Sequence, residues 1–361
     1  MTKPVPLAAP RIGAEERSAV DAVLRSGMLT QGPETRAFES EFSATVADRP
    51  CVAVNSGTSA LLLALKALGI GPGDEVILPS FTFAATANAV VLAGAVPVFA
   101  DIEPDTFTLA PNGLSSAITS RTAAVLPVHL YGHPADMTAL SRVARRHSLA
   151  IVEDAAQAHL AMIGGLPVGT LGDAAAFSFY PTKNMTTGEG GMVVTNSEET
   201  ARIARLLRNQ GMEQRYRNEI VGYNMRMTDI HAAIGRVQLR SLKTWTERRR
   251  RNAAVLANAL RGVEVPIERS DAQHVYHQFT IRVPGGRRDA LSSALSEAGI
   301  GNAVYYPVPV HLLPAYGREN LDLPETNRAT HEVLSIPVHP SLSRNDLRRV
   351  VAEINRFTGA G

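Results

Sequence analysis

The sequence contains a single cysteine, Cys51, and this scarcity excludes several classes of protein. One thiol cannot form an internal disulfide framework, and it cannot supply a cysteine-rich zinc site. We therefore expect a reducing, cytoplasmic setting and no metal. Because cysteine is among the residues most often buried, Cys51 is expected to be a small core residue.

An excess of charge of one sign is also lacking, since 36 lysines and arginines face 34 acidic residues and the formal net charge is +2 at pH 7. This balance does not indicate a polyanionic partner, so nucleic acid is not expected. The first residues, MTKPVPLAAPRIG, lack the apolar core of a signal peptide.

Long apolar runs are similarly scarce. The one uncharged stretch long enough to cross a bilayer lies between Glu75 and Asp101, and Pro79 and Pro97 interrupt it. Polar residues are scattered through it, so we interpret it as strands and a helix of an α/β core. No membrane partner is expected.

Apolar strand patterns alternate with helical patterns over the first half of the chain. Strands are predicted at 51–54, 75–79, 96–101, 123–129 and 149–154, with helices between them. This order indicates a mostly parallel sheet with helices on both faces. Because 361 residues exceed one typical core, we predict two domains. The first is an N-terminal arm and large domain over 1–240, and the second is a small α+β domain over 241–361.

Two charged residues stand out, because ligands of such sheets collect at the carboxyl ends of strands. Asp154 ends an apolar strand, where a carboxylate is costly unless a cation faces it. Lys183 follows a strand that ends near Ser178 and precedes a glycine turn at 188–191. A partly desolvated lysine in such a turn has a lowered pKa and can act as a Schiff-base nucleophile.

The segment NSGTS at 55–59 opens a helix directly after a strand. Backbone N–H groups at a helix start can hold a phosphate, although an ordinary N-cap would look the same. Pyridoxal phosphate requires a lysine, an acid for its ring nitrogen, a phosphate cradle and a ring sandwich. The sequence offers a candidate for each, namely Lys183, Asp154, the helix start at Gly57, Thr58 and Ser59 together with Ser178, and Phe83.

Several longer segments resemble one known family. They are LTQGPETRAFE, NSGTSAL, GPGDEVILPSFTFAATANAV, PVHLYGHPADM, IVEDAAQAH, AFSFYPTKNMTTGEGGMVVT and GYNMRMTDIHAAIG. They run from about residue 28 to 235, and the weaker YYPVPVHLLPAY extends the match. The sequence thereby resembles the DegT/StrS-type (DegT/DnrJ/EryC/StrS) sugar aminotransferases, which are fold-type I pyridoxal-phosphate enzymes. The resemblance implies a large domain with a mostly parallel seven-stranded sheet flanked by helices, and a smaller C-terminal α+β domain.

The resemblance also implies a role for each candidate. Lys183 would form the Schiff base, and Asp154 would hold the ring nitrogen. Gln157 would touch the phenolic oxygen of the cofactor, and Phe83 would stack on its ring. The phosphate would be held by Thr58, Ser59, Ser178 and, from a neighbouring subunit, Asn224, which implies a homodimer with shared active sites.

The implied reaction is a two-stage transamination. An amino group passes from a donor, expected to be L-glutamate, to the cofactor to give pyridoxamine phosphate (PMP), and then to a keto group of a nucleotide-activated sugar. Lys183 would move the proton in each stage. Three alternatives remain: a sugar dehydratase, whose sister enzymes replace the lysine by histidine; a keto-cyclitol aminotransferase; and a catalytically silent sugar-nucleotide sensor. The loop at 27–33 resembles members that act on 4-keto sugars more than those that act on 3-keto sugars.

Three further features carry separate expectations. Leu160 stands where the family usually has glycine. His129 and His133 straddle a strand end and a turn, so they are not expected to form a metal pair. The four arginines at 248–251 point around a helix, which favours a solvated helix over a phosphate site.

Overall fold

The computed structural model describes residues 3–317 and 320–359. Its main sheet has seven strands in the order β1 (Cys51–Val54), β9 (Gly191–Thr195), β8 (Ala174–Ser178), β5 (Ala150–Asp154), β4 (Thr122–Val125), β2 (Glu75–Pro79) and β3 (Val96–Ala100). Only β9 runs against the others, because it pairs antiparallel with both β1 and β8. The prediction of a mostly parallel seven-stranded sheet is confirmed.

Helices cover both faces of this sheet, which explains why β1, β2, β8 and β9 are buried along their whole length. One face packs against α3 (Gly57–Ala67), α4 (Ala84–Ala93) and α7 (Glu198–Arg208). The other packs against α2 (Pro33–Ser43) at one end, and against α5 (Pro111–Ala117) and α6 (Met137–Arg146) at the other. Cys51 is buried in the core between the sheet and α2, as expected for a core residue.

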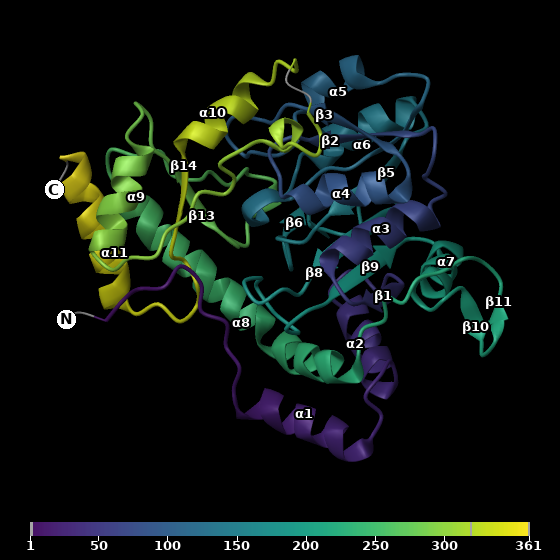
Figure 1. Cartoon of the computed structure of the whole chain (residues 1–361). Coiled ribbons are helices and arrows are strands. Elements are labelled where there is room, and N and C mark those ends of the chain that lie inside the picture. The colour runs from purple at the N-terminus through teal and green to yellow at the C-terminus, as the bar shows by residue number, and fades with distance from the viewer. Residues whose placement is uncertain (1–2, 318–319, 360–361) are drawn as a thin grey trace.

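A long helix, α8 (Asp229–Ala259), runs from the large sheet toward the C-terminal elements (Figure 1). Its first half packs against α1 (Ala14–Ser26) and α2, and its last turns share a core with β13 (Phe279–Arg282), β14 (Val333–Ile336) and α11 (Arg344–Thr358). The predicted division at residue 240 therefore falls inside one continuous helix. The position of the domain boundary stays a prediction.

The C-terminal elements also hold the start of the chain. Val5 bonds to the backbone of Gly299 and Gly301 and belongs to the same core as Leu334 and Val350. Figure 1 accordingly shows both termini on the side of α9 (Arg288–Glu297) and α11. From there the N-terminal segment crosses back along α8 to reach α1.

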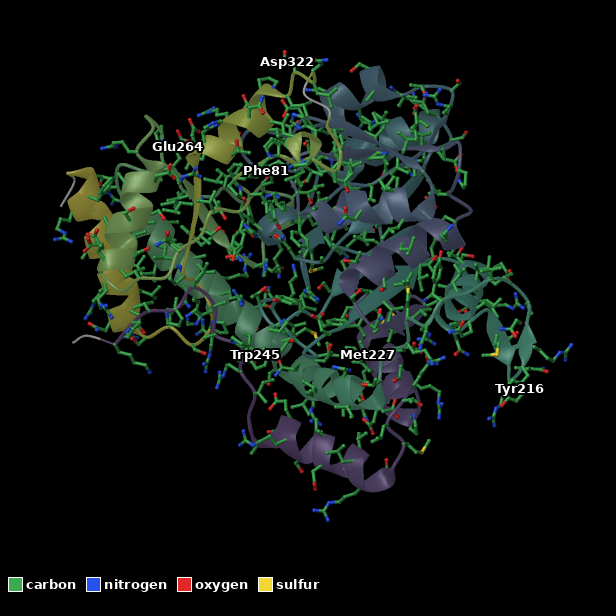
Figure 2. The ribbon with its side chains drawn as sticks, viewed as in Figure 1. Phe81, Tyr216, Met227, Trp245, Glu264 and Asp322 are labelled. Carbon is green, nitrogen blue, oxygen red and sulfur yellow. The ribbon has the colours of Figure 1, made fainter. Side chains whose placement is uncertain are left out.

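Smaller elements complete the described chain. A hairpin of β10 (Met212–Gln214) and β11 (Arg217–Asn218) projects from the large sheet, and Figure 2 shows Tyr216 at its tip. The remaining elements are β6 (Met162–Ile163), β7 (Leu166–Pro167), β12 (Ala272–Gln273), α10 (Pro324–Glu332) and two short 3-10 turns at Leu130–Gly132 and Val310–Leu312. No helix among the described residues is long and apolar enough to span a membrane.

Candidate active site

A cavity of about 660 Å³ opens at the carboxyl ends of β5 and β8, which is a size typical of small-molecule sites. It gathers residues that are far apart in the sequence. Of the residues predicted for the site, it is lined by Gly57, Thr58, Phe83, Asp154, Gln157, Ser178 and Lys183. Ser59 and Asn224 do not line it.

Lys183 lies in the turn that follows β8, where its backbone N–H donates to the carbonyl of Tyr180 at 2.9 Å. The side chain is half-buried. Burial lowers the pKa of its ammonium to about 8, and the negative charge of Asp154 works against this change. Lys183 therefore gives up a proton far more readily than an exposed lysine, as a nucleophile and proton carrier must.

Asp154 ends β5 and is 5% exposed. One carboxylate oxygen accepts from the Thr86 hydroxyl at 2.9 Å, and the other accepts from the backbone N–H of Ala156 at 3.1 Å. Burial raises the pKa of Asp154, although these bonds and Lys183 oppose that rise. A buried carboxylate with so few donors, facing a cavity, is suited to hold a protonated ring nitrogen.

The start of α3 forms one wall of the cavity and fits a phosphate. No residue of the described chain accepts a hydrogen bond from the amide of Gly57 or Thr58, so both donors remain available. A Cβ at Gly57 would lie 2.7 Å from Cβ of Ser178, so only glycine lets the helix start approach the end of β8. Ser59 does not line the cavity, and its amide donates to the Ser56 hydroxyl at 3.1 Å.

Gln157 is held from two sides. Its Oε1 accepts from the backbone N–H of Tyr131 at 2.7 Å, and its Nε2 donates to the Tyr306 hydroxyl at 3.1 Å. Phe83, at the N-cap of α4, is 59% exposed, and its ring centre lies 6.0 Å from that of Tyr306. The exposed Phe83 ring is available for stacking, and the predicted contacts of both residues with a cofactor stay predictions.

Several residues that line the same cavity were not predicted from the sequence. Thr86 comes from α4, Tyr131 follows β4, and the others belong to loops of the C-terminal part, namely His277, Gln278, Tyr305 and Tyr306. The segment YYPVPVHLLPAY, which contains both of these tyrosines, indicates only a resemblance to the family. Two adjacent tyrosines before prolines were the available signal, but nothing local shows which strand end that loop will face.

Asn224 is exposed and lies outside this cavity, where it forms an isolated β-bridge with Asn209. Its predicted contact with a neighbouring subunit stays a prediction. Leu160 has a φ of 63°, a left-handed conformation that glycine adopts without steric cost. This left-handed backbone conformation explains why the family usually has glycine at this position.

The two histidines considered as a metal pair have other partners. His129 accepts from the backbone N–H of Ala135 on Nδ1, so its Nε2 carries the proton and donates to Glu153 at 3.0 Å. Nδ1 of His133 lies 2.7 Å from the carbonyl of Pro134. Both rings are buried and fixed by neighbours of their own loop or strand.

The interpretation of the arginine run as a solvated helix face is correct for Arg248 and Arg251, which are exposed. It is wrong for Arg249, which is only 6% exposed. Four consecutive residues cover all sides of an α-helix, so one of them had to face the protein interior.

The chain is similar to known proteins over nearly its whole length. The model of the DegT/DnrJ/EryC1/StrS aminotransferase family matches residues 10–355. The chain is 46% identical over 351 residues to dTDP-3-amino-3,4,6-trideoxy-α-D-glucose transaminase from Streptomyces venezuelae, covering 95% of this chain and 92% of that protein. It is 42% identical over 347 residues to a pleiotropic regulatory protein from Geobacillus stearothermophilus, covering 94% and 93%.

Solved structures give the same result. The chain resembles S. venezuelae DesV in complex with a ketimine intermediate, with a TM-score of 0.95, 45% identity and 99% of each chain covered. Pyridoxal phosphate is the cofactor of such enzymes, and the cavity supplies a lysine, a buried acid and free amides at a helix start for it. The chain therefore belongs to the DegT/DnrJ/EryC1/StrS aminotransferase family.

Proposed function

We propose that this aminotransferase moves an amino group from L-glutamate to a keto group of a nucleotide-activated sugar in the cytoplasm, and that it works as a homodimer. The observation that carries the proposal is that Lys183 and Asp154 line one cavity and influence each other's pKa. The transaminase from S. venezuelae, at 46% identity, supports a sugar nucleotide as acceptor.

Pyridoxal phosphate, when bound, supplies an electron sink that stabilises negative charge on the carbon beside the transferred nitrogen. Asp154 would keep a proton on the ring nitrogen. The amides of Gly57 and Thr58, with the Ser178 hydroxyl, would hold the phosphate. Gln157 is the candidate contact for the phenolic oxygen.

Lys183 would carry the proton in both halves of the exchange. With a pKa near 8, its Nζ can take a proton from the α-carbon of the donor and deliver that proton to the cofactor. In the second half it would deliver a proton to the carbon that becomes the amine-bearing carbon of the sugar. The walls formed by Tyr131 and Tyr306 would limit water at this carbon.

The assignment of Lys183 is tested with Lys183→Ala. The variant should lose the absorption band that borohydride reduces and should lose transamination, while it still takes up pyridoxal phosphate. Full retention of the reducible band would remove Lys183 from this role.

The substrate is tested with L-glutamate and a panel of nucleotide 3-keto and 4-keto sugars, with keto-cyclitols included. Mass spectrometry and NMR then identify the aminated product. The loop at 27–33 favours the 4-keto position, whereas the S. venezuelae relative is named for a 3-amino sugar, so the panel decides between them. A deoxygenated product would favour a dehydratase.

Shared active sites are tested by subunit mixing. If Asn224 serves the neighbouring subunit, Lys183→Ala and Asn224→Ala chains should each be impaired alone and should recover about a quarter of wild-type activity when mixed. The recovery arises because half of the dimers are mixed and each then holds one intact site. A sedimentation measurement that shows only monomers would contradict the proposal.

One relative is named a regulatory protein, so a catalytically silent sensor is the competing function. Such a protein needs a phosphate cradle but does not need both Lys183 and Asp154. A purified chain that stays colourless with pyridoxal phosphate, yet binds a sugar nucleotide, would favour the sensor.

A further inference from the structure

Arg249 differs from the other arginines of its run. On α8, Arg248 and Arg251 are exposed, and Arg250 pairs with Glu268 at 2.6 Å. Arg249 is buried and does not line the active-site cavity. A buried guanidinium without a function in the reaction needs another explanation.

The guanidinium of Arg249 has hydrogen-bond partners but no counter-charge. Its Nη1 donates to the carbonyls of Tyr276 and His277 at 3.2 and 3.3 Å, and its buried Nε has no partner. Among the described residues, no carboxylate lies within 4.0 Å of it. Burial lowers the pKa of Arg249 to about 10, so the group is still charged at neutral pH. An unpaired buried charge is strongly unfavourable.

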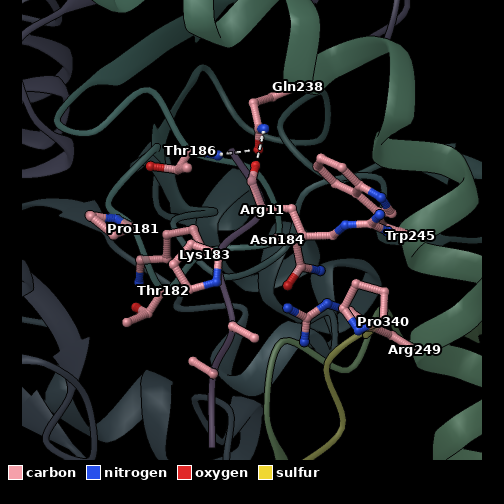
Figure 3. A pocket seen from close by; sticks show the side chains of 13 residues that line it. Arg11, Pro181, Thr182, Lys183, Asn184, Thr186, Gln238, Trp245, Arg249 and Pro340 are labelled. Atoms are coloured by element: carbon pink, nitrogen blue, oxygen red, sulfur yellow. Dashed lines mark hydrogen bonds between the residues drawn. The ribbon is translucent and has the colours of Figure 1, made fainter. Parts of the chain in front are cut away.

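A second, small cavity lies beside this guanidinium (Figure 3). It leaves about 20 Å³ for the centre of a water-sized particle, enough for one such particle. In Figure 3 the side chains of Arg249 and Asn184 reach toward each other from α8 and from the turn that carries Lys183. The other lining residues are residues 8–11 of the N-terminal segment, residues 181–183 and Thr186 of the turn, Gln238 and Trp245 of α8, and Pro340.

None of the described residues that line this cavity is acidic, so no lining side chain compensates the charge of Arg249. Burial, together with the positive charges of Lys183 and Arg249, lowers the pKa of His159 to about 3. His277 has a pKa well below the usual value for the same reasons. Both rings are therefore neutral at pH 7, and the local charge is positive.

We propose that a halide-sized monovalent anion, chloride under ordinary conditions, binds in this cavity against Arg249. The anion compensates the buried guanidinium and accepts the hydrogen bond of its Nε. Because most of the walls come from the N-terminal segment, from α8 and from the turn that carries Lys183, the bound anion holds these three parts together. This inference does not depend on the proposed substrate.

The single tryptophan of the chain provides a direct probe, because Trp245 lines the cavity. Bromide is titrated into the apo-protein at constant ionic strength with gluconate as the replaced anion. We expect saturable quenching of Trp245 fluorescence and a rise of the unfolding temperature of about 3 °C at saturation. Arg249→Gln should lose both effects, and Arg248→Gln, one residue away on the exposed face, should keep both.

A crystallographic measurement tests the same site if Arg249→Gln does not fold. Bromide-soaked crystals of the wild-type protein should show an anomalous peak within hydrogen-bonding distance of Nε of Arg249. Absence of that peak, or equal and non-saturable quenching in Arg248→Gln and Arg249→Gln, would overturn the proposal. Sulfate, which is too large for the cavity, should give no saturable response.

Discussion

Two neighbouring carboxylates on β5, Glu153 and Asp154, have opposite surroundings. Glu153 is fully buried and accepts four hydrogen bonds, which come from Nε2 of His129 and from the amides of Gly169, Leu171 and Gly172 at 2.7–3.0 Å. Asp154, on the other face of the strand, accepts two. Successive strand residues point to opposite faces, so one carboxylate enters the protein interior and the other enters the active-site cavity.

The pKa values follow these surroundings. Burial raises the pKa of Glu153, but the hydrogen bonds from His129 and the backbone outweigh burial, and its pKa lies below the ordinary value. Burial of Asp154 is not outweighed, and its pKa is raised. A buried carboxylate whose acceptor sites all receive hydrogen bonds stabilises the fold, whereas one with unused acceptor sites can bind a ligand.

The largest expected effect comes from Asp154→Asn. Loss of the carboxylate opposite the ring nitrogen should lower kcat about 1,000-fold. The unfolding free energy of the apo-protein should not fall, because the charge of Asp154 is unfavourably buried. Steady-state kinetics and urea unfolding of the apo-protein check the two parts, and a variant with nearly normal kcat would refute the assigned role.

Glu153→Gln should show the reverse pattern. A neutral amide would place its own N–H group among backbone donors, so the apo-protein should lose about 3 kcal/mol of unfolding free energy. The folded fraction should retain most of its cofactor binding. Glu247→Gln, at an exposed position of α8, is the control and should stay within about 0.5 kcal/mol of the wild type.

A smaller effect is expected at Thr86, the one described residue whose side chain donates a hydrogen bond to Asp154. Thr86→Val keeps the shape and removes the donor, so kcat should fall about tenfold. Thr86→Ser should restore it. If valine and serine behave alike, the hydrogen bond does not position Asp154. A shift of the acid limb of the pH–rate profile in the valine variant would separate a positioning effect from a packing effect.

The smallest effects concern pH. The folded pKa of Glu153 lies below its ordinary value of 4.5, so its stabilisation is present above that pH and is lost as pH falls through the folded pKa. The folded pKa of Asp154 lies above its ordinary value of 3.8, so its cost is largest at neutral pH and fades on acidification. Urea unfolding of apo wild type, Glu153→Gln and Asp154→Asn between pH 2 and 7 should show these opposite trends, with the Glu153 contribution changing only below pH 4.5.

The comparison of β5 also shows how far sequence reasoning reaches. Asp154 and Lys183 were identifiable because a charge at the end of an apolar strand, or in the following turn, is a local pattern. The partners of Asp154 and Gln157 were not, since Thr86 and Tyr306 lie 68 and 149 residues away along the chain. Such contacts depend on which loops the packed domains bring to one strand end.

The arginines of α8 show that burial also depends on residues distant in the sequence. Their spacing identified a helix but not which of the four residues faces the interior, because the rotation of α8 is fixed by its packing against α1, α2 and the C-terminal sheet. The buried Arg249 and the small cavity beside it were therefore invisible in the sequence.

The sequence by itself determined the alternation of strands and helices, the mostly parallel sheet and the lysine and acid of the site, because periodicity and strand ends are local properties. Only the tertiary structure decided that Glu153 is satisfied while Asp154 is not, and that C-terminal tyrosines close the cavity. It also decided that Arg249 is buried with no carboxylate of the described residues within 4.0 Å. Hydrogen-bond satisfaction, burial and charge compensation depend on residues distant in sequence, and folding alone brings these together.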